Sequence, residues 1–271
     1  MSIPRVLAIA GSDPSGGAGI QADLKTFSAL RAYGCAALTS LTAQSTQGVT
    51  GIHPVPAAFV REQVETLLAD VRLNAVKIGM LGTAEVVEVV TDLVRDQLTC
   101  PVVLDPVMVS TAGSRLLDQD AVEAIRALTP LADVITPNLA EAAVLLGRDE
   151  QASTAAVTIE AMRQQARALR DLGAPRVLLK GGHATGLQAV DVWVDGDTLR
   201  VLRARRIDTA NTHGTGCTLS SAVAALVPQR NTWLEAVTDA KAYLTGALRH
   251  AHELAVGQGP GPVHHFFKLW R

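Results

Sequence analysis

The chain has 271 residues, 48% of them apolar, and a formal net charge of −2. That is enough material for a large core, and because α/β folds of this size often form one domain, we expect a single domain over residues 1–271. The balanced charge, with no long run of Lys or Arg, argues against nucleic acid or an anionic membrane as a partner, and no apolar run is long enough to span a bilayer. Three widely spaced cysteines argue against a disulfide framework and a zinc ribbon, so we expect a cytoplasmic protein.

Short apolar or β-branched runs alternate with stretches of helical period along the chain. We predict strands at residues 5–10, 35–43, 75–81, 101–107, 133–136 and 175–180. We predict helices at residues 17–32, 57–70, 83–97, 118–128, 138–147, 158–172, 215–227 and 232–255, and an exposed loop at 148–157. Two further runs, 190–194 and 199–204, predict an edge hairpin. This order indicates an α/β fold with a central, mostly parallel β-sheet flanked by helices on both faces and an antiparallel edge hairpin.

Ligands of open parallel sheets bind beyond the C-terminal ends of the strands. The polar and small residues that we predict at those ends are Gly11-Ser12-Asp13, Gln44, Gly79-Met80, Asp105, Thr136-Pro137-Asn138 and Lys180-Gly181-Gly182-His183. These positions are therefore the first candidates for a binding site.

The most informative segment is residues 211–218, Asn-Thr-His-Gly-Thr-Gly-Cys-Thr, which directly precedes a predicted helix. Gly214 and Gly216 permit a tight turn that aims unpaired backbone N–H groups, at the positive end of a helix dipole, at one spot. Such a turn is an anion site suited to phosphate. Cys217 lies on the same turn, where we expect its thiol to titrate lower than usual. An anion site beside a proton acceptor indicates transfer of a phosphoryl group to an alcohol.

The first loop, Gly11 to Gly19, contains four glycines, including the two at its ends. Gly17-Ala18-Gly19 followed by Ala22 imitates a dinucleotide fingerprint, but the next predicted strand ends near Gln44 with no acidic residue to hold a ribose. We therefore disfavour dinucleotide binding. Two interpretations stay open for this loop: close approach of the backbone to a small substrate, and a plain strand-to-helix turn.

Three side chains have both a functional and a structural interpretation. Asp23 lies early in a predicted helix, where a carboxylate favours the helix dipole without any function. Gln44 carries an acceptor and two donors that can pair with the ring nitrogen and amino group of an aminopyrimidine, or it is a solvated loop residue. Met80 can pack over a flat heterocycle or simply fill the core.

Three further residues fit a phosphoryl-transfer site. A carboxylate that closes a buried strand, as Asp105 does, is costly unless it is paired or binds a metal such as magnesium. Glu141 completes a capping-box pattern with Asn138, which favours a structural role, although a carboxylate there could hold metal-bound water. Lys180 could lean over a phosphate as a point charge, or it snorkels from a strand end.

Together these motifs resemble bacterial hydroxymethylpyrimidine/phosphomethylpyrimidine kinases, which have the ribokinase-like fold. The resemblance runs in order from near residue 5 to the end of the chain. It is carried by residues 11–30, 77–81, 103–108, 135–138 with Glu141, 179–183, 211–218 and 261–266. It implies ATP-dependent phosphorylation of 4-amino-5-hydroxymethyl-2-methylpyrimidine, and then of its monophosphate to the diphosphate, in thiamine diphosphate biosynthesis, with ATP and Mg²⁺ as cofactors.

The resemblance also implies roles for individual residues. Cys217 would be the base near the hydroxymethyl group, beside an anion hole formed by Gly214, Thr215 and Gly216. The substrate pocket would be formed by Gln44, Met80, Gly11, Ala18, Asp23 and Val107. Asp105 and Glu141 would serve the metal, and Asn138 and Lys180 the phosphates.

Other functions remain open from the sequence. A pyridoxal or pyridoxine kinase shares the fold and the anion hole, and Gln44 could also accommodate a pyridoxine ring. A non-catalytic sensor of the pyrimidine or nucleotide is disfavoured by the presence of Asp105, Lys180 and Cys217 together. The edge hairpin could pair across a homodimer, and the loop at 183–188 is our candidate for a mobile lid.

Overall fold

The computed structural model describes residues 2–108, 119–148, 158–182 and 186–270. Its strands are β1 (Arg5–Ala10), β2 (Tyr33–Leu38), β3 (Ser40–Ser45), β4 (Gly48–Pro54), β5 (Ala75–Ile78), β6 (Val102–Leu104), β7 (Val134–Ile135), β8 (Arg176–Lys180), β9 (Gln188–Asp195) and β10 (Thr198–Arg205). Its α-helices are α1 (Gly19–Ala29), α2 (Ala57–Leu68), α3 (Ala84–Asp96), α4 (Gln119–Leu128), α5 (Leu139–Leu145), α6 (Ile159–Asp171), α7 (Thr215–Leu226) and α8 (Trp233–Arg249). Short 3₁₀ helices occupy Thr129–Leu131, Val227–Gln229 and Ala251–Leu254.

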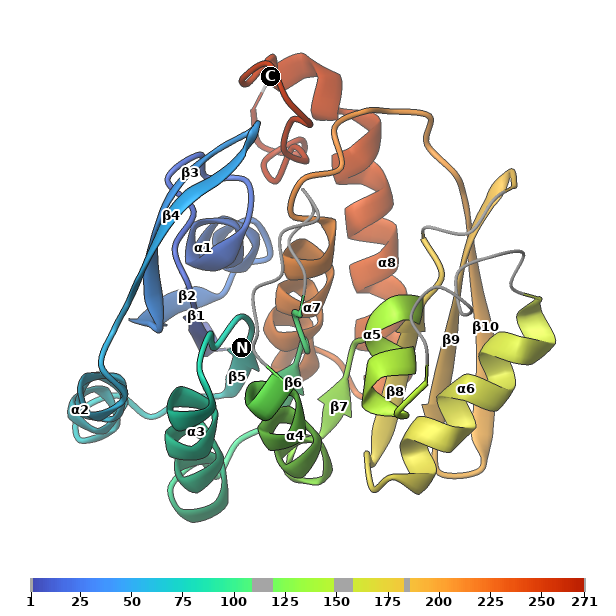
Figure 1. Cartoon of the computed structure of the whole chain (residues 1–271). Helices are drawn as coiled ribbons and strands as arrows, with labels where there is room; N and C mark the ends of the chain where they lie inside the picture. Colours follow the sequence, from blue (N-terminus) through green and yellow to red (C-terminus); the bar gives the residue numbers. More distant parts are fainter. Residues whose placement is uncertain (1, 109–118, 149–157, 183–185, 271) are drawn as a thin grey trace.

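Eight strands form one sheet in the order β10-β9-β8-β7-β6-β5-β1-β2 (Figure 1). The strands from β2 to β8 in this order are parallel to their neighbours, whereas β9 pairs antiparallel with both β8 and β10. The predicted α/β class, the mostly parallel sheet and the antiparallel edge hairpin are therefore confirmed.

The alternation of side chains along the central strands divides the core into two layers. On β1, Leu7 and Ile9 face the layer that is closed by α2 to α6, whereas Val6 and Ala8 face the layer closed by α1, α7 and α8. All four side chains are fully buried, which is typical of a parallel strand covered by helices on both faces.

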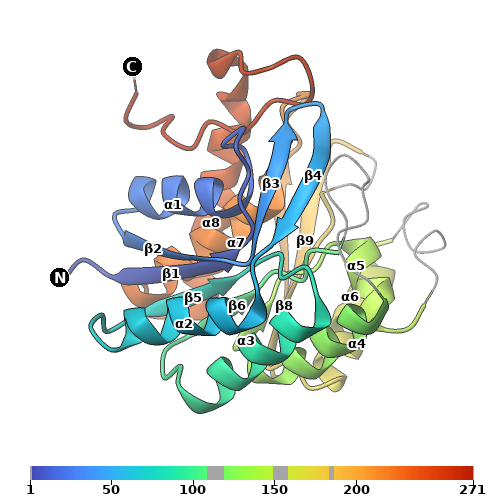
Figure 2. The same ribbon diagram turned by 60° about the vertical axis from the view of Figure 1, so that its left-hand side comes forward.

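The second predicted strand is wrong in one respect. We expected a single strand over residues 35–43, but the chain leaves the main sheet after Leu38, and β3 pairs with β4 in a separate antiparallel sheet. Figure 2 shows this two-stranded ribbon rising from the body of the molecule next to α1. Gln44 therefore lies within β3, at an irregularity in its pairing, and not at the end of a strand of the central sheet.

Other boundaries differ by small amounts. The last predicted helix ends at Arg249 and is followed by the 3₁₀ turn Ala251–Leu254, so it stops short of residue 255. Most of the loop predicted at 148–157 and part of the candidate lid at 183–188 lie outside the described residues. Within the described ranges, no helix combines the length and apolar character needed to cross a bilayer.

Candidate active site

The predicted anion turn is present at the start of α7. Gly214 is the residue before the helix, with a left-handed backbone (φ 75°), and no side chain caps the helix there. Its carbonyl accepts the first helical bond from Thr218, at 2.9 Å. None of the hydrogen bonds in the described part of the chain uses the backbone N–H of Gly216 or Cys217. Two donors at the positive end of a helix are therefore available for an anion.

The glycine-rich first loop packs directly against this turn. A methyl group on Gly214 would overlap the carbonyl oxygen of Gly17 and lie 3.2 Å from the Cα of Ala18. The left-handed backbone and this close approach both require glycine at position 214. The loop therefore brings its backbone against another segment of the protein, whereas the close approach to a small substrate stays a prediction.

Asp13 organises the loop and joins it to the turn. Its carboxylate, almost completely buried, accepts hydrogen bonds from the backbone N–H groups of Ser15 (2.9 Å) and Ala18 (2.8 Å). The carboxylate also accepts from the hydroxyl of Ser15 at 2.7 Å and from the backbone N–H of Gly17 at 3.2 Å, and the Nε2 of His213, one residue before the turn, lies 2.7 Å from it. Burial opposes its charge, but the hydrogen bonds from His213, Ser15 and Ala18 lower the pKa of Asp13 to about 2. The sequence analysis did not assign this role to Asp13 or His213.

Cys217 is half-buried on the first turn of α7, and its sulfur accepts a hydrogen bond from the backbone N–H of Gly19. Burial raises the pKa of the thiol to about 11, although the nearby ammonium of Lys77 acts in the opposite direction. Our expectation of a lowered pKa is therefore wrong for the ligand-free protein, because desolvation outweighs the helix N-terminus. At neutral pH the group is a thiol.

Asp23 is fully buried behind Cys217. Its two carboxylate oxygens bind the ammonium of Lys77 at 3.0 and 2.9 Å, and the hydroxyl of Ser221 donates to one of them at 2.6 Å. The helix-dipole interpretation of Asp23 is wrong, because α1 begins at Gly19 and its first turn contains no acidic residue. The expected place in the pocket lining is also wrong, because the carboxylate has no exposed surface.

Asp105, Lys180 and Glu141 form a second charged cluster next to the turn. The ammonium of Lys180 lies 2.8 Å from Asp105 and 3.9 Å from Glu141. A methyl group on Gly216 would lie 3.3 Å from that ammonium and 3.6 Å from a carboxylate oxygen of Asp105. The cluster is thus in contact with the anion turn.

Hydrogen bonds from two neighbouring elements hold Asp105 in place. The hydroxyl of Thr136, after β7, donates to one carboxylate oxygen at 3.0 Å, and the hydroxyl of Ser220 on α7 donates to the other at 3.1 Å. Burial opposes the charge of Asp105, but Lys180 and Lys77 lower its pKa. Asp105 is therefore a carboxylate at neutral pH.

The capping-box interpretation of Glu141 is confirmed. Its carboxylate accepts from the backbone N–H of Asn138 at 2.7 Å, and the Asn138 side chain accepts from the backbone N–H of Glu141 at 2.9 Å. Burial raises the pKa of Glu141 to about 7, although Lys180 acts against the rise. This carboxylate is therefore close to its titration point at neutral pH.

Gln44 and Met80 both lie close to the start of the first loop. The hydroxyl of Thr42 donates to the carbonyl of Ser12 at 2.9 Å, and its oxygen lies 3.2 Å from the side-chain oxygen of Gln44. A methyl group on Gly11 would overlap the terminal methyl of Met80. Gln44, Ser12, Gly11 and Met80 are therefore neighbours in the folded chain.

The first loop also connects this group to Cys217. The carbonyl of Gly11 accepts from the backbone N–H of Ile20 at 3.0 Å, and a methyl group on Gly19 would overlap that same carbonyl. Gly19 in turn donates to the sulfur of Cys217. Two short steps of contact therefore lead from Gly11 to the thiol. Val107 is half-buried in the segment after β6, and its N–H bonds the carbonyl of Asp105 at 2.8 Å.

The whole chain matches known proteins. Residues 13–264 match the family model described as phosphomethylpyrimidine kinase. The chain belongs to this family.

A hydroxymethylpyrimidine/phosphomethylpyrimidine kinase of Rhizobium meliloti (strain 1021) is 50% identical over 266 residues, which cover 98% of each chain. Among solved structures, an ADP complex of Bacillus subtilis pyridoxal kinase has a TM-score of 0.87 at 38% identity and covers 99% of this chain and 100% of its own. The Staphylococcus aureus pyridoxal kinase, in complex with AMP-PCP and pyridoxal, has a TM-score of 0.88 at 34% identity, and the match covers 99% of this chain and 96% of that chain. These neighbours confirm the ribokinase-like fold.

The C-terminal segment is a further part of the kinase that sequence reasoning did not connect to the turn. The backbone N–H of His213 donates to the carbonyl of Gly261 at 3.1 Å. The Nε2 of His265 lies 3.1 Å from the hydroxyl of Thr218, the residue after Cys217. Burial lowers the pKa of His265 to about 3, so its ring is neutral. The only sequence signal for these contacts was the family-like tail at 261–266.

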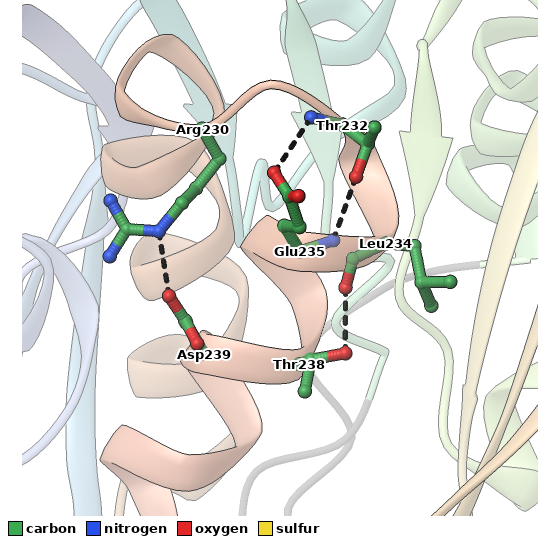
Figure 3. A pocket seen from close by; sticks show the side chains of 6 residues that line it. All are labelled: Arg230, Thr232, Leu234, Glu235, Thr238 and Asp239. Atoms are coloured by element: carbon green, nitrogen blue, oxygen red, sulfur yellow. Dashed lines mark hydrogen bonds and ion pairs between the residues drawn. The ribbon is translucent and has the colours of Figure 1, made fainter.

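One surface hollow lies away from this site, at the N-terminal end of α8 (Figure 3). Its lining groups are already paired: Arg230 binds Asp239 at 2.6 Å, and Thr232 and Glu235 form a capping box. The hollow therefore presents the ordinary start of a helix, and we assign no function to it.

Proposed function

We propose that this protein phosphorylates 4-amino-5-hydroxymethyl-2-methylpyrimidine with ATP, and then phosphorylates the monophosphate to the diphosphate, in thiamine diphosphate biosynthesis. The names of its relatives support this substrate, because they include hydroxymethylpyrimidine/phosphomethylpyrimidine kinases at 50% and 47% identity over nearly the whole chain. One observation carries the proposal: the turn that leaves the N–H groups of Gly216 and Cys217 free also carries the Cys217 sulfur, and the Lys180–Asp105 pair contacts the turn at Gly216.

The anion turn and Lys180 would stabilise the transferring phosphoryl group. Negative charge spreads over the equatorial oxygens of that group in the transition state, so positive potential that is already in position lowers the barrier. The N–H groups of residues 214–217, of which those of Gly216 and Cys217 have no partner in the described part of the chain, would supply this potential together with the ammonium of Lys180. Asn138 would contribute to phosphate binding from the start of α5, although its side chain also caps that helix.

Cys217 would accept the proton of the substrate alcohol. As the alcohol oxygen bonds to the γ-phosphorus and the bond to the ADP oxygen breaks, the hydroxyl proton would pass to the sulfur, and the thiol would later release it to solvent. No covalent phosphocysteine forms. Because Cys217 is a thiol at neutral pH in the ligand-free protein, this role requires that the assembled site stabilises the thiolate.

The pyrimidine would bind between the first loop and β3. Gln44 would pair with the ring nitrogen and amino group, and Met80 would cover a ring face. Gly11, Ala18 and Val107 would complete the pocket. The connection from Gly11 through Gly19 to Cys217 supports this proposal, because Gly11 lies within two contacts of the Cys217 sulfur.

The acidic side chains near the turn fit Mg²⁺. In the described part of the chain, no three His, Cys, Asp or Glu side chains are grouped to hold a metal ion. Two buried carboxylates, Asp105 and Glu141, do lie around the ammonium of Lys180, and Mg²⁺ is commonly held by one or two carboxylates together with substrate phosphates and water. When bound, Mg²⁺ would neutralise charge on the nucleotide phosphates.

Pyridoxal is the second candidate substrate, because the solved structures with TM-scores of 0.87 and 0.88 are pyridoxal kinases. Side-by-side incubation of the purified protein with ATP and either alcohol, followed by product mass, separates the two. Our proposal predicts that hydroxymethylpyrimidine gains one and then two phosphates. Faster turnover of pyridoxal, or no transfer from ATP at all, contradicts it.

Two other expectations belong to this proposal. We propose that residues 1–271 act as one domain, which is supported by the single sheet that collects strands from Arg5 to Arg205. We also retain the expectation of a homodimer in the cytoplasm. Light scattering of the purified protein measures the mass in solution, for which we expect twice that of one chain.

A further inference from the structure

A fully buried ion pair, Lys77–Asp23, is hydrogen-bonded to the helix that carries Cys217. Lys77 points from β5 into the layer between the sheet and α1, where it binds both carboxylate oxygens of Asp23. Both side chains are 0% exposed. A lysine is almost never fully buried without a partner, and taking two charges out of water costs several kcal/mol per ion by general estimates. A contribution to stability therefore does not explain why this charged pair is buried.

Three elements build this pair around Cys217. Asp23 comes from α1, whose first residue, Gly19, donates its backbone N–H to the sulfur. Ser221, which holds Asp23 at 2.6 Å, lies four residues after Cys217 and thus on the same face of α7. The missing side chain of Gly79 leaves room for the ammonium, because a methyl group there would lie 2.6 Å from the Lys77 nitrogen.

Four charged groups act on the Cys217 sulfur from the elements packed around it. Lys77 on β5 and Lys180 on β8 favour the thiolate, whereas Asp23 on α1 and Asp105 after β6 oppose it. Lys180 is bound to Asp105 and also faces Glu141. Among these groups, Lys77 has the strongest favourable effect on the thiolate.

We propose that Lys77 is a positioning residue for the kinase reaction: its buried ammonium, held by Asp23 and Ser221, stabilises the thiolate of Cys217. Asp23 serves as the holder of this charge and not as a substrate ligand. The thiolate then accepts the alcohol proton next to a fixed positive charge, without reorganisation of water. This inference rests on the base role that we propose for Cys217.

The test measures the thiol itself and not phosphoryl transfer. The ligand-free protein reacts with iodoacetamide between pH 8 and pH 10.5, and peptide mass follows alkylation at Cys217 separately from Cys35 and Cys100. Below its pKa, the rate follows the thiolate fraction, so one unit of pKa changes the rate tenfold. Lys77→Met should slow alkylation at pH 9 by about tenfold, and Asp23→Asn should accelerate it by a similar factor.

The opposite signs distinguish electrostatics from general damage. Disruption of the packing would change both single variants in the same direction, and that result overturns the proposal, as does no change in either. Lys241→Met is the matched control, because Lys241 forms a comparable buried pair with Asp191 at 2.6 Å. We expect its alkylation profile to equal that of the wild type. Slowing equal to that of Lys77→Met would contradict us.

A double variant covers the case in which Lys77→Met does not fold. Lys77→Met with Asp23→Asn leaves no unpaired buried charge, so its fold is less at risk. We expect it to react more slowly than the wild type, because it lacks the buried ammonium that the proposal makes responsible for stabilising the thiolate. A rate equal to or above that of the wild type overturns the proposal. Because no substrate is present, the result is independent of which alcohol the kinase uses.

Discussion

Gly214→Ala probes the contact between the anion turn and the first loop. Position 214 has φ 75°, and a methyl group there would lie 2.8 Å from the carbonyl carbon of Gly17 and overlap its oxygen. Gly196→Ala is the matched control. Gly196 is also left-handed, with φ 55°, but a methyl group there would meet nothing within 4 Å.

The two variants share one cost and differ in the other. A left-handed backbone at an alanine lowers the free energy of unfolding by about 1–2 kcal/mol, and this loss applies to both variants. Gly214→Ala must also displace the Gly17–Ala18 backbone, whose N–H groups bind Asp13 at 3.2 and 2.8 Å. Overpacking of this kind costs about 1–3 kcal/mol. We therefore expect a loss of about 2–5 kcal/mol for Gly214→Ala and about 1–2 kcal/mol for Gly196→Ala.

Urea denaturation at 25 °C gives both free energies of unfolding, and steady-state turnover gives the effect on catalysis. Gly196→Ala should keep its kcat, because the hairpin turn is remote from the site. Gly214→Ala should lose most of its turnover, since the N–H groups at the start of α7 shift with the loop. If the two variants agree within about 0.5 kcal/mol and both turn over normally, the packing of loop against turn does not have the importance that we assign to it.

Three other predictions concern the network around the turn. The free energy of unfolding of Asp13→Asn should lie below that of the wild type, and this difference should shrink by about 1 kcal/mol between pH 5 and pH 3. The reason is that the lowered pKa of Asp13 stabilises the wild type only while the carboxylate is charged, and this stabilisation is lost as the pH falls. A difference that stays constant in denaturation at several pH values would refute this. Between pH 7 and pH 5 the wild type should lose about 2 kcal/mol of unfolding free energy, since the folded His265 ring, with its pKa of about 3, stays neutral while the unfolded ring becomes charged. His265→Gln should remove this loss. An unchanged dependence of stability on pH would contradict a neutral, buried His265. Lys180→Met should lower kcat by about 10²–10³-fold yet retain pyrimidine binding by calorimetry, and a normal kcat would exclude the phosphate role.

The central sheet could be predicted because its strands are covered on both faces and read as short apolar runs. The assignment of uninterrupted apolar runs to single strands also explains the error at residues 35–43. Thr39 separates β2 from β3 with no Gly or Pro to mark a break, and the alternating pattern of β3 resembles a continuation of β2. Only the pairing of β3 with β4, the next strand of a hairpin that we did not predict, shows that a second sheet begins there.

The anion turn was predictable for a local reason, since glycine spacing and a following helix lie within eight residues. The pKa of Cys217 was not, because it depends on burial and on charges from four other elements. One feature of the sequence does indicate Lys77: it is a charged residue in the apolar strand Ala-Val-Lys-Ile, two positions after the buried Ala75 and therefore on the same face of the sheet. A buried lysine needs a carboxylate, but the sequence could not indicate which one.

The most direct test of the central claim compares the two phosphorylations in Cys217→Ala. The first acceptor is an alcohol that must lose a proton, whereas the second is a phosphate that is already an anion. We predict that the first step slows by about 10²–10⁴-fold and the second by much less, with pyrimidine binding retained. Near-normal turnover of the alcohol, or equal losses in the two steps, would show that Cys217 is not the base.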